Sequence, residues 1–369
     1  MMSCLAEKYQ IVIVFCACDV QGDQHYNTQM AVSSDGRLLA KYHKMHLYDP
    51  SPGHGESTHA SYPAAADPTF FDTPFGIRFG MHTCFDMAFS TPAAAMALDP
   101  LLGISDFVFP TGWVVASPPM LPANAVQQGW SRGVGVNLLA ADSAHSWGSS
   151  GSGIYSEGRA LVKRVTPFSP EQGTMLLAVV PVLRKASPNI QAIKPNWNYK
   201  TAPKAGAQLL MNTMATAMSK SASSTMTITK LMPNLRSGAV SANTSDGFSC
   251  HLQYSLTTEP VAEQFALLAL NGHWLEGVIR SRSCLLFRCR TDECSVDPLF
   301  TVANDLNSST TFERLELQGD FYPGDLVLPM LALSGGDIMD DGNMKFQGGN
   351  MIVTNLDKPL LNAMLYASL

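Results

Sequence analysis

The segment Phe79-Gly-Met-His-Thr-Cys-Phe-Asp86 joins a short alternating apolar pattern to a cysteine that follows it directly. Ile77, Phe79 and Met81 alternate with other residues, as expected for a β-strand. Cys84 would therefore lie at a strand end, where a sharp turn can expose its sulfur and aim the next backbone N–H at a developing oxyanion. The pattern predicts a sheet with a cysteine at its edge.

Similar short runs in the first half of the chain predict further strands between glycine and proline residues. The expected strands are 11–17, 28–33, 69–72, 77–83, 107–109, 136–140 and 176–180. The expected helices are 91–102 and 123–132, each followed by glycine, which commonly ends a helix. Ser34-Asp-Gly36 predicts a hairpin turn. This mixture indicates an α/β fold with a buried sheet.

The apolar run Ile11 to Cys18 allows two interpretations. With the residues before it, the run imitates a short signal peptide, but only Lys8 is basic, Glu7 offsets it, and no small-residue cleavage site follows. We therefore expect a buried strand, so that the chain begins inside a domain.

Composition limits the class of protein. The 369 residues can form one large domain or two ordinary ones, and 46% hydrophobic against 15% charged residues suits a well-buried globular chain. A net charge of −6 without a Lys/Arg run argues against a nucleic-acid partner. The longest apolar runs are too short for a transmembrane segment.

Changes in composition divide the chain. Residues 1–184 form the expected α/β domain, and residues 185–245, rich in small and polar residues, are expected to be a crossing segment or linker. Residues 246–369 mix apolar and polar residues over short runs between turns, which predicts a smaller antiparallel β domain.

Four of the eight cysteines, at 250, 284, 289 and 294, lie close together late in the chain. Their spacing matches no common zinc pattern, so a disulfide cluster is the more natural interpretation and no metal site is expected. Two glycosylation sequons, at Asn243 and Asn307, lie nearby. Together these features favour an oxidising, secretory compartment.

Cys84 has two physical interpretations. A buried structural cysteine is the commoner fate of a lone cysteine after an apolar strand. A nucleophile would need a positive neighbour to become a thiolate, and Lys44 could supply that charge. Asn137 and His145 also permit a papain-like arrangement, although the residues around Cys84 do not resemble that family.

Five motifs, taken together and in order, favour the nucleophilic interpretation of Cys84 over the structural one. They are Lys41-Tyr-His-Lys-Met-His-Leu-Tyr48, Phe71-Asp-Thr-Pro-Phe-Gly76, Thr83-Cys-Phe-Asp86, Phe109-Pro-Thr-Gly-Trp113 and Gly151-Ser-Gly-Ile-Tyr155. This set resembles the vanin/biotinidase branch of the nitrilase superfamily. The resemblance continues weakly through Cys250-His-Leu-Gln-Tyr254 and the late cysteines, which look like that family's C-terminal domain.

The resemblance implies a fold and a reaction. The fold would be a nitrilase-type α-β-β-α sandwich lacking its first elements, followed by the β-rich domain. Cys84 would be the nucleophile, Lys44 the catalytic lysine, and Phe85 the backbone donor to the oxyanion. The reaction would be hydrolysis of a linear amide, of the pantetheine or biotinyl type, through a thioester without a cofactor. Trp113 could line the acyl pocket or fill the core.

The family's third catalytic residue has no counterpart at its expected place. By the resemblance, a glutamate base should precede the Ser3-Cys-Leu-Ala6 segment. The acids before Lys44 are Glu7, Asp19, Asp23 and Asp35, expected in a helix end, a loop and a turn. We therefore expect either an N-terminally incomplete enzyme that hydrolyses no amide as given, or a silent secreted homologue that acts by binding.

Nearby polar residues have simpler interpretations. The histidines at 43, 46, 54 and 59 lack metal-ligand spacing on one helix face, so we expect pocket or loop positions for them. Asp86 is expected to brace the turn after Cys84.

Overall fold

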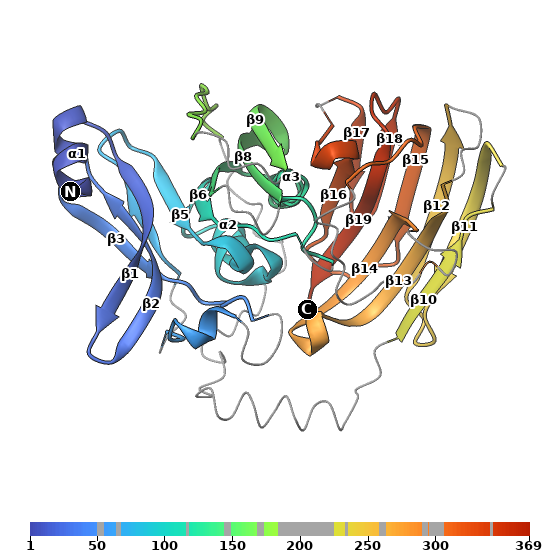
Figure 1. The fold of residues 1–369 in the computed structure, drawn as a ribbon, viewed down its shortest axis with the longest axis horizontal. Coiled ribbons are helices and arrows are strands. Elements are labelled where there is room, and N and C mark those ends of the chain that lie inside the picture. The colour runs from blue at the N-terminus through green and yellow to red at the C-terminus, as the bar shows by residue number, and fades with distance from the viewer. Residues whose placement is uncertain are drawn as a thin grey trace.

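The computed structural model describes residues 1–369 except 50–54, 64–67, 116–117, 144–148, 168–172, 184–224, 233–234, 258–262, 290–293, 295–305 and 340–341. From the side of the molecule that holds α1 to the opposite side, the described residues form layers of sheet, sheet, helix, sheet and sheet (left to right in Figure 1). The predicted class, an α/β part followed by a β-rich C-terminal part, is confirmed.

The first layer is a three-stranded antiparallel sheet, here called the N-terminal sheet. It follows helix α1 (Met2–Tyr9) and consists of β1 (Ile13–Gln21), β2 (Gln24–Val32) and β3 (Leu38–His43). The predicted turn between β2 and β3 is confirmed, and Gly36 there has φ +81°, which glycine adopts without strain. The expected burial of β1 is wrong: β1 is an edge strand that pairs with β2 alone among the described strands, and its residues are half-buried or exposed.

The second layer is a six-stranded mixed sheet in the order β4-β5-β6-β7-β8-β9. Its strands are β4 (Phe70–Asp72), β5 (Arg78–Met81), β6 (Asp106–Thr111), β7 (Asn137–Asp142), β8 (Ser149–Ser156) and β9 (Arg159–Pro167). Strands β5, β6 and β7 are parallel, so their carboxyl ends meet at one edge of the sheet. The strand expected at 176–180 is not formed, although those residues are described.

Helices cover the far face of the mixed sheet. The expected helix 91–102 is shorter, consisting of a π-helical turn (Ser90–Ala94) and α2 (Ala95–Leu98), whereas α3 (Ala123–Val134) is confirmed. The near face packs on the N-terminal sheet through a small apolar core that includes Ala31, Tyr42 and Met81. The chain therefore places the end of β3 close to the end of β5.

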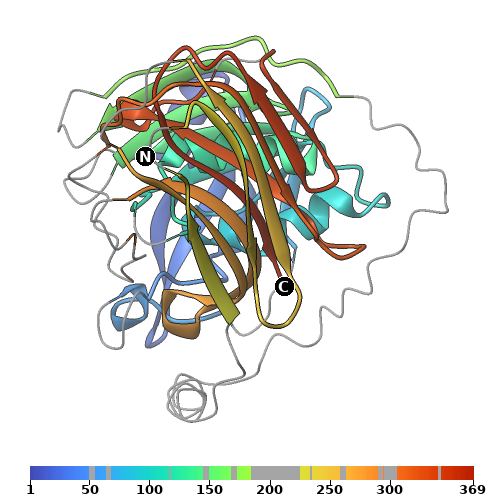
Figure 2. The ribbon, with the colours of Figure 1, turned by 90° about the vertical axis from the view of Figure 1, so that its right-hand side faces the viewer.

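The C-terminal part is a sandwich of two five-stranded antiparallel sheets (Figure 2). The inner sheet consists of β10 (Thr225–Lys230), β13 (Phe265–Trp274), β14 (Ile279–Arg288), β19 (Leu360–Ser368) and β16 (Leu328–Leu333). The outer sheet consists of β11 (Ser237–Asn243), β12 (Ser249–Leu256), β15 (Phe312–Gly319), β18 (Asn350–Thr354) and β17 (Met344–Gln347). Strands β10 and β11 lie within the segment expected to be a linker, so the sandwich extends further towards the N-terminus than the composition indicates.

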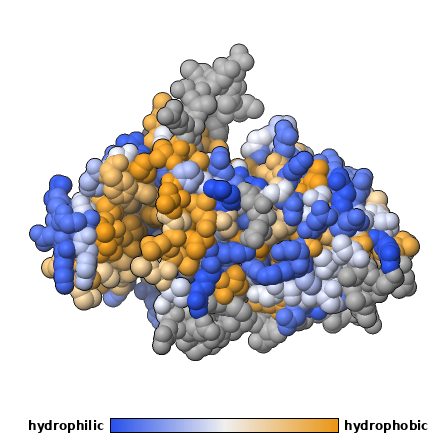
Figure 3. Space-filling view, turned by 90° about the horizontal axis from the view of Figure 1, so that it is seen from above, coloured by the Kyte–Doolittle hydropathy of each residue, from blue (hydrophilic) through white to orange (hydrophobic). Residues whose placement is uncertain are grey.

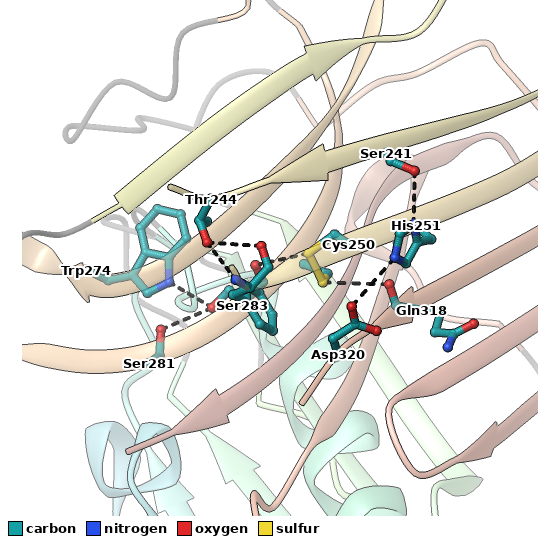
Figure 4. The surroundings of a disulfide bond; sticks show 11 residues. Ser241, Thr244, Cys250, His251, Trp274, Ser281, Ser283, Gln318 and Asp320 are labelled. Atoms are coloured by element: carbon teal, nitrogen blue, oxygen red, sulfur yellow. Dashed lines mark hydrogen bonds and ion pairs between the residues drawn. A yellow bond between two sulfur atoms is a disulfide. The ribbon is translucent and has the colours of Figure 1, made fainter. Parts of the chain in front are cut away.

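The late cysteines are paired. Cys250 of β12 bonds to Cys284 of β14 and thereby joins the outer sheet to the inner sheet (Figure 4). Cys289 bonds to Cys294, which comes five residues later in the chain. The predicted disulfide cluster is confirmed, and the described residues contain no group of side chains suited to a metal ion.

The inner sheet also packs on the α/β part. Helix α3 lies on β16, where Gly129 and Gly133 allow close approach: an added Cβ would come within 2.4 Å and 2.7 Å of atoms in β16 or next to it.

Seen from above, apolar side chains gather over the N-terminal side of the molecule (Figure 3). Among the described residues, no helix has the length and apolar character needed to span a bilayer.

Candidate active site

Cys84 lies in a strained turn directly after β5. It is buried, and its φ of +50° places a non-glycine residue in the left-handed region. It opens a short 3-10 turn, η2 (Cys84–Ala88), in which Phe85 follows it. Strain of this kind persists only where the surrounding structure imposes it, and it is concentrated at functional sites. The Cys84 Sγ lies 3.7 Å from the carbonyl oxygen of Gly112, just beyond the end of β6.

Asp86 holds this turn in place. Its carboxylate accepts a hydrogen bond from the Thr83 backbone N–H at 3.0 Å, which closes a capping box. It also accepts hydrogen bonds from the Tyr42 hydroxyl at 2.8 Å and the His46 backbone N–H at 2.9 Å. Burial would raise the pKa of Asp86, but His46 and the other partners outweigh it and hold the pKa below its usual value. The expected bracing role fits this geometry.

The same network positions Lys44, because Tyr42 and His46 lie on either side of it in the chain. Lys44 follows β3, and its backbone N–H donates to the Asn27 carbonyl at 2.8 Å. Its side chain is 1% exposed. Burial would lower the pKa of Lys44, yet the charges of Cys84, Glu56 and Asp86 raise it above the usual value. A buried ammonium therefore acts electrostatically on the Cys84 thiol.

Glu56 is the partner of that ammonium. One of its carboxylate oxygens accepts hydrogen bonds from the Lys44 Nζ and from the Tyr48 backbone N–H, and the other accepts from the Asn27 amide at 3.0 Å. An acid was expected before Lys44, whereas this one comes twelve residues after it. From the sequence, an active chain would have to use a base within it, such as Glu56 or Asp23, and no local pattern chooses between these two.

The protonation of Cys84 reflects opposing effects. Burial raises the pKa of its thiol above the usual value, and the Lys44 ammonium lowers it. Negative charges on Glu56 and Asp142 raise it further. Together these effects favour the thiol over the thiolate at neutral pH.

Asp142 is a second carboxyl group that the sequence did not reveal. It ends β7, beside the carboxyl ends of β5 and β6, and accepts hydrogen bonds from the backbone N–H groups of Trp113 at 3.0 Å and Gly151 at 2.8 Å. Burial raises its pKa to about 7, against the lowering effect of these N–H groups. Asp142 therefore titrates near neutral pH beside the site.

Trp113 lies next to Gly112 and is 4% exposed. Its indole N–H donates to the Leu121 carbonyl at 2.9 Å, and its ring lies 6.4 Å from that of Phe109. The structure therefore brings Trp113 close to Cys84 and also packs it firmly in the core, so both expected roles are compatible with its position.

The remaining candidates lie elsewhere. Asn137 begins β7, at the opposite end of the mixed sheet from Cys84, where its amide donates to Asp106 at 2.7 Å. Five residues of strand separate it from Asp142, about 17 Å, so Asn137 is not placed for a papain-like site. The other papain-like candidate, His145, lies outside the described residues.

The four early histidines do not form one site. The His46 ring contacts Asp86 at 3.0 Å, the His43 ring contacts Asp19 at 2.8 Å, and His59 is exposed. His54 lies outside the described residues.

Comparison with known proteins agrees with this architecture. The carbon-nitrogen hydrolase family model matches residues 1–100, and the vanin C-terminal domain model matches residues 215–368. In both parts the chain is similar to the vanin/biotinidase branch of the carbon-nitrogen hydrolases.

Three relatives illustrate the similarity. Human pantetheine hydrolase VNN2 is 28% identical over 95% of this chain and 66% of its own length. Biotinidase of Takifugu rubripes is 29% identical over 80% and 60%, and human pantetheinase is 29% identical over 90% and 62%. The chain thus spans less than two thirds of the length of each of these relatives. Among solved structures, Saccharomyces cerevisiae Nit3 aligns with 44% of this chain and 59% of its own at 23% identity, with a TM-score of 0.36.

Proposed function

We propose that this chain cleaves linear amides by hydrolysis through a thioester on Cys84. The observation that carries the proposal is the convergence of Cys84 and Lys44, which come from different sheets, with Lys44 buried and bonded to Glu56. A fixed cation beside a buried thiol favours its ionised form and stabilises negative charge that develops next to it.

The steps follow from these positions. The Cys84 thiolate attacks the amide carbon, and the resulting oxyanion is stabilised by the Lys44 ammonium and the Phe85 backbone N–H. The proton that the Cys84 thiol gives up on attack passes to the amine nitrogen as the C–N bond breaks, and the neutral amine leaves. Water attacks the thioester, which releases the acid and regenerates the thiol. Glu56, whose oxygens are already occupied by Lys44, Asn27 and a backbone N–H, orients the ammonium.

The substrate class is a pantetheine-type or biotinyl amide. This choice rests on the names of the relatives, which include pantetheinases and biotinidases. Trp113 would form part of the wall against the acyl chain, since its neighbour Gly112 contacts the thiol. Two disulfides and exposed sequon asparagines at 243 and 307 support a secreted, glycosylated protein.

A second candidate is a catalytically silent secreted homologue that binds such amides without cleaving them. The raised pKa of Cys84 favours it, because a thiol that stays protonated is a poor nucleophile. Substrate contact or closure would have to change that balance for catalysis to occur.

One experiment separates the two candidates. The chain is assayed with a chromogenic pantetheine-type amide and with a biotinyl amide, beside Cys84→Ser and the control Cys18→Ser, an exposed thiol on β1. If the chain is a hydrolase, we expect turnover in the parent and in Cys18→Ser, and no turnover in Cys84→Ser. If Cys84→Ser kept a tenth of the activity, a barrier change of only ~1.4 kcal/mol, Cys84 would not be the nucleophile. Saturable binding without turnover in the parent would contradict hydrolysis by this chain and favour the binding role.

A further inference from the structure

The last strand of the chain reaches the nucleophile turn. The Tyr366 hydroxyl of β19 donates a hydrogen bond to the carbonyl oxygen of Ala88, the last residue of η2, at 2.5 Å. Tyr366 and Ala88 are 278 residues apart in the chain, and Tyr366 is fully buried. Burial raises the pKa of Tyr366, so its hydroxyl keeps the proton that it donates.

Strand β19 is a firm support for this contact. It lies between β14 and β16 in the inner sheet, with Tyr366 paired to Ser283 on one side and to Leu328 on the other. Side chains alternate along it: Met364 and Tyr366 belong to the core shared with the α/β part, whereas Leu365 between them belongs to the core of the sandwich. The sandwich therefore fixes the position of the Tyr366 hydroxyl from both sides.

The contact also lies next to the residues that carry Lys44. Phe89 follows Ala88 directly, and its ring stacks on the His46 ring with centroids 3.8 Å apart. Phe85, within the same turn, packs edge-on against Tyr48 with ring centroids 5.2 Å apart. His46 and Tyr48 follow Lys44 closely in the chain. A shift of the Ala88 carbonyl would therefore be transmitted to both the thiol and the ammonium.

Two other hydrogen bonds between the two parts lie away from this turn. The Gln128 amide of α3 donates to the Met339 carbonyl at 3.1 Å, and the Lys163 ammonium of β9 donates to the Ile338 carbonyl at 2.7 Å. These bonds hold the parts together at the side of α3 and β9. Tyr366 differs from them because its partner belongs to the turn that contains Cys84.

We propose that Tyr366 is a positioning residue through which the C-terminal sandwich sets the geometry of Cys84 relative to Lys44. The proposal rests on the proposed function for its consequence in catalysis. Its physical content is independent of turnover, because the position of Lys44 also sets the ionisation and reactivity of the thiol.

The first test measures Cys84 alkylation by iodoacetamide as a function of pH, with Cys84 followed by peptide mass spectrometry. Tyr366→Phe removes one oxygen atom, and Tyr254→Phe, in the core of the sandwich away from the α/β part, is the matched control. We expect Tyr366→Phe to slow alkylation near neutral pH about tenfold and to move the midpoint to higher pH, a smaller effect than the ~10²-fold loss that a 1 Å misplacement of reacting groups causes. Tyr254→Phe should leave the profile unchanged.

A purely structural role for Tyr366 would lower the melting temperature and leave the alkylation profile superimposed on the parent's, which would overturn the proposal. Amide turnover is measured in the same samples. A parent without turnover contradicts the proposed hydrolase, while the alkylation profiles still decide the role of Tyr366.

The second test uses the unaltered protein, so it does not depend on a variant that folds. Hydrogen exchange of the 84–90 peptide is followed over increasing denaturant beside a peptide from β19. We expect both to lose protection at the same denaturant concentration, because β19 holds the turn. Local opening of 84–90 while β19 stays protected would show that Tyr366 does not hold the turn, and would overturn the proposal.

Discussion

The ring of His46 and the carboxylate of Asp86 are in direct contact, with Nδ1 and Oδ1 3.0 Å apart, and this contact ties the lysine-bearing loop to the nucleophile turn. Asp86 comes two residues after Cys84, and His46 comes two residues after Lys44. Because Asp86 also binds the Tyr42 hydroxyl and the Thr83 N–H, one buried carboxylate fixes both groups.

Replacing that carboxylate should therefore affect both stability and reactivity. Asp86→Asn puts an amide NH2 where all of the neighbours donate, so we expect a loss of about 3 kcal/mol in the free energy of unfolding. Urea denaturation measures it, with Asp72→Asn, an exposed partner of Arg78, as the control. Equal effects of the two variants would contradict the central role of Asp86.

Stability should also depend on Asp86 through pH. Its pKa in the folded protein is below the unfolded value of ~3.9, so its stabilising contribution is complete above that value and is lost as pH falls through the folded pKa. Parallel acid unfolding curves for the parent and Asp86→Asn would contradict this assignment.

Removing the ammonium should make Cys84 less reactive. Lys44→Met keeps a long side chain but removes the charge that lowers the thiol pKa, so the midpoint of Cys84 alkylation should move to higher pH. If the proposed hydrolase is correct, turnover should fall about 10²- to 10³-fold, as when one oxyanion donor is deleted. Lys41→Met is the control, because it removes a half-exposed ammonium that pairs with Asp19. Normal acylation in Lys44→Met would refute the role.

The buried imidazole of His82 should limit stability. Neither ring nitrogen has a hydrogen-bond partner in the described part of the chain, and the ring packs among Phe107, Phe109 and Trp130. His82→Phe should therefore raise the free energy of unfolding by about 1–3 kcal/mol, measured by urea denaturation. The control is His59→Phe at an exposed position. A destabilised His82→Phe protein would show that the imidazole has a partner or a required shape.

The same residue predicts a pH dependence. Burial lowers the pKa of His82 to about 3, whereas an unfolded histidine titrates near ~6.5. Between these values the unfolded state binds the extra proton, so stability falls as pH falls, by about 1.4 kcal/mol per pH unit from this residue. His82→Phe should reduce the slope of unfolding free energy against pH in that window, and an unchanged slope would contradict the assignment.

The two disulfides should contribute differently to the free energy of unfolding. Cys250–Cys284 closes a separation of 34 residues and Cys289–Cys294 one of 5. By loop-closure entropy, replacing the first pair with alanine should cost about 4 kcal/mol and the second about 2 kcal/mol. Thermal unfolding of the two double variants tests this order.

The same four cysteines also test the compartment. Mass spectrometry without reduction should find none of the four alkylated in secreted material, and alkylation of all four would indicate a reducing compartment.

Much of the α/β part could be predicted from local sequence. The alternation before Cys84, the Asp-Gly turn at 35–36 and the helix 123–134 have strong local signals, and the structure reproduces them with shifts of a few residues. The strand expected at 176–180 is not formed, because a short apolar run has no strand signal beyond its composition. The exposure of β1 could not be predicted, because a strand lies at the edge of a sheet only when no other strand pairs with its free side.

Contiguous motifs were enough to predict the candidate nucleophile Cys84 and its lysine Lys44, and changes in composition were enough to predict two β-containing parts. Only the tertiary structure placed Glu56 on Lys44, Asp142 beside the site and Tyr366 on the nucleophile turn. Those contacts join residues from different strands and loops. No local pattern encodes them, because they exist only after the sheets have packed and excluded water.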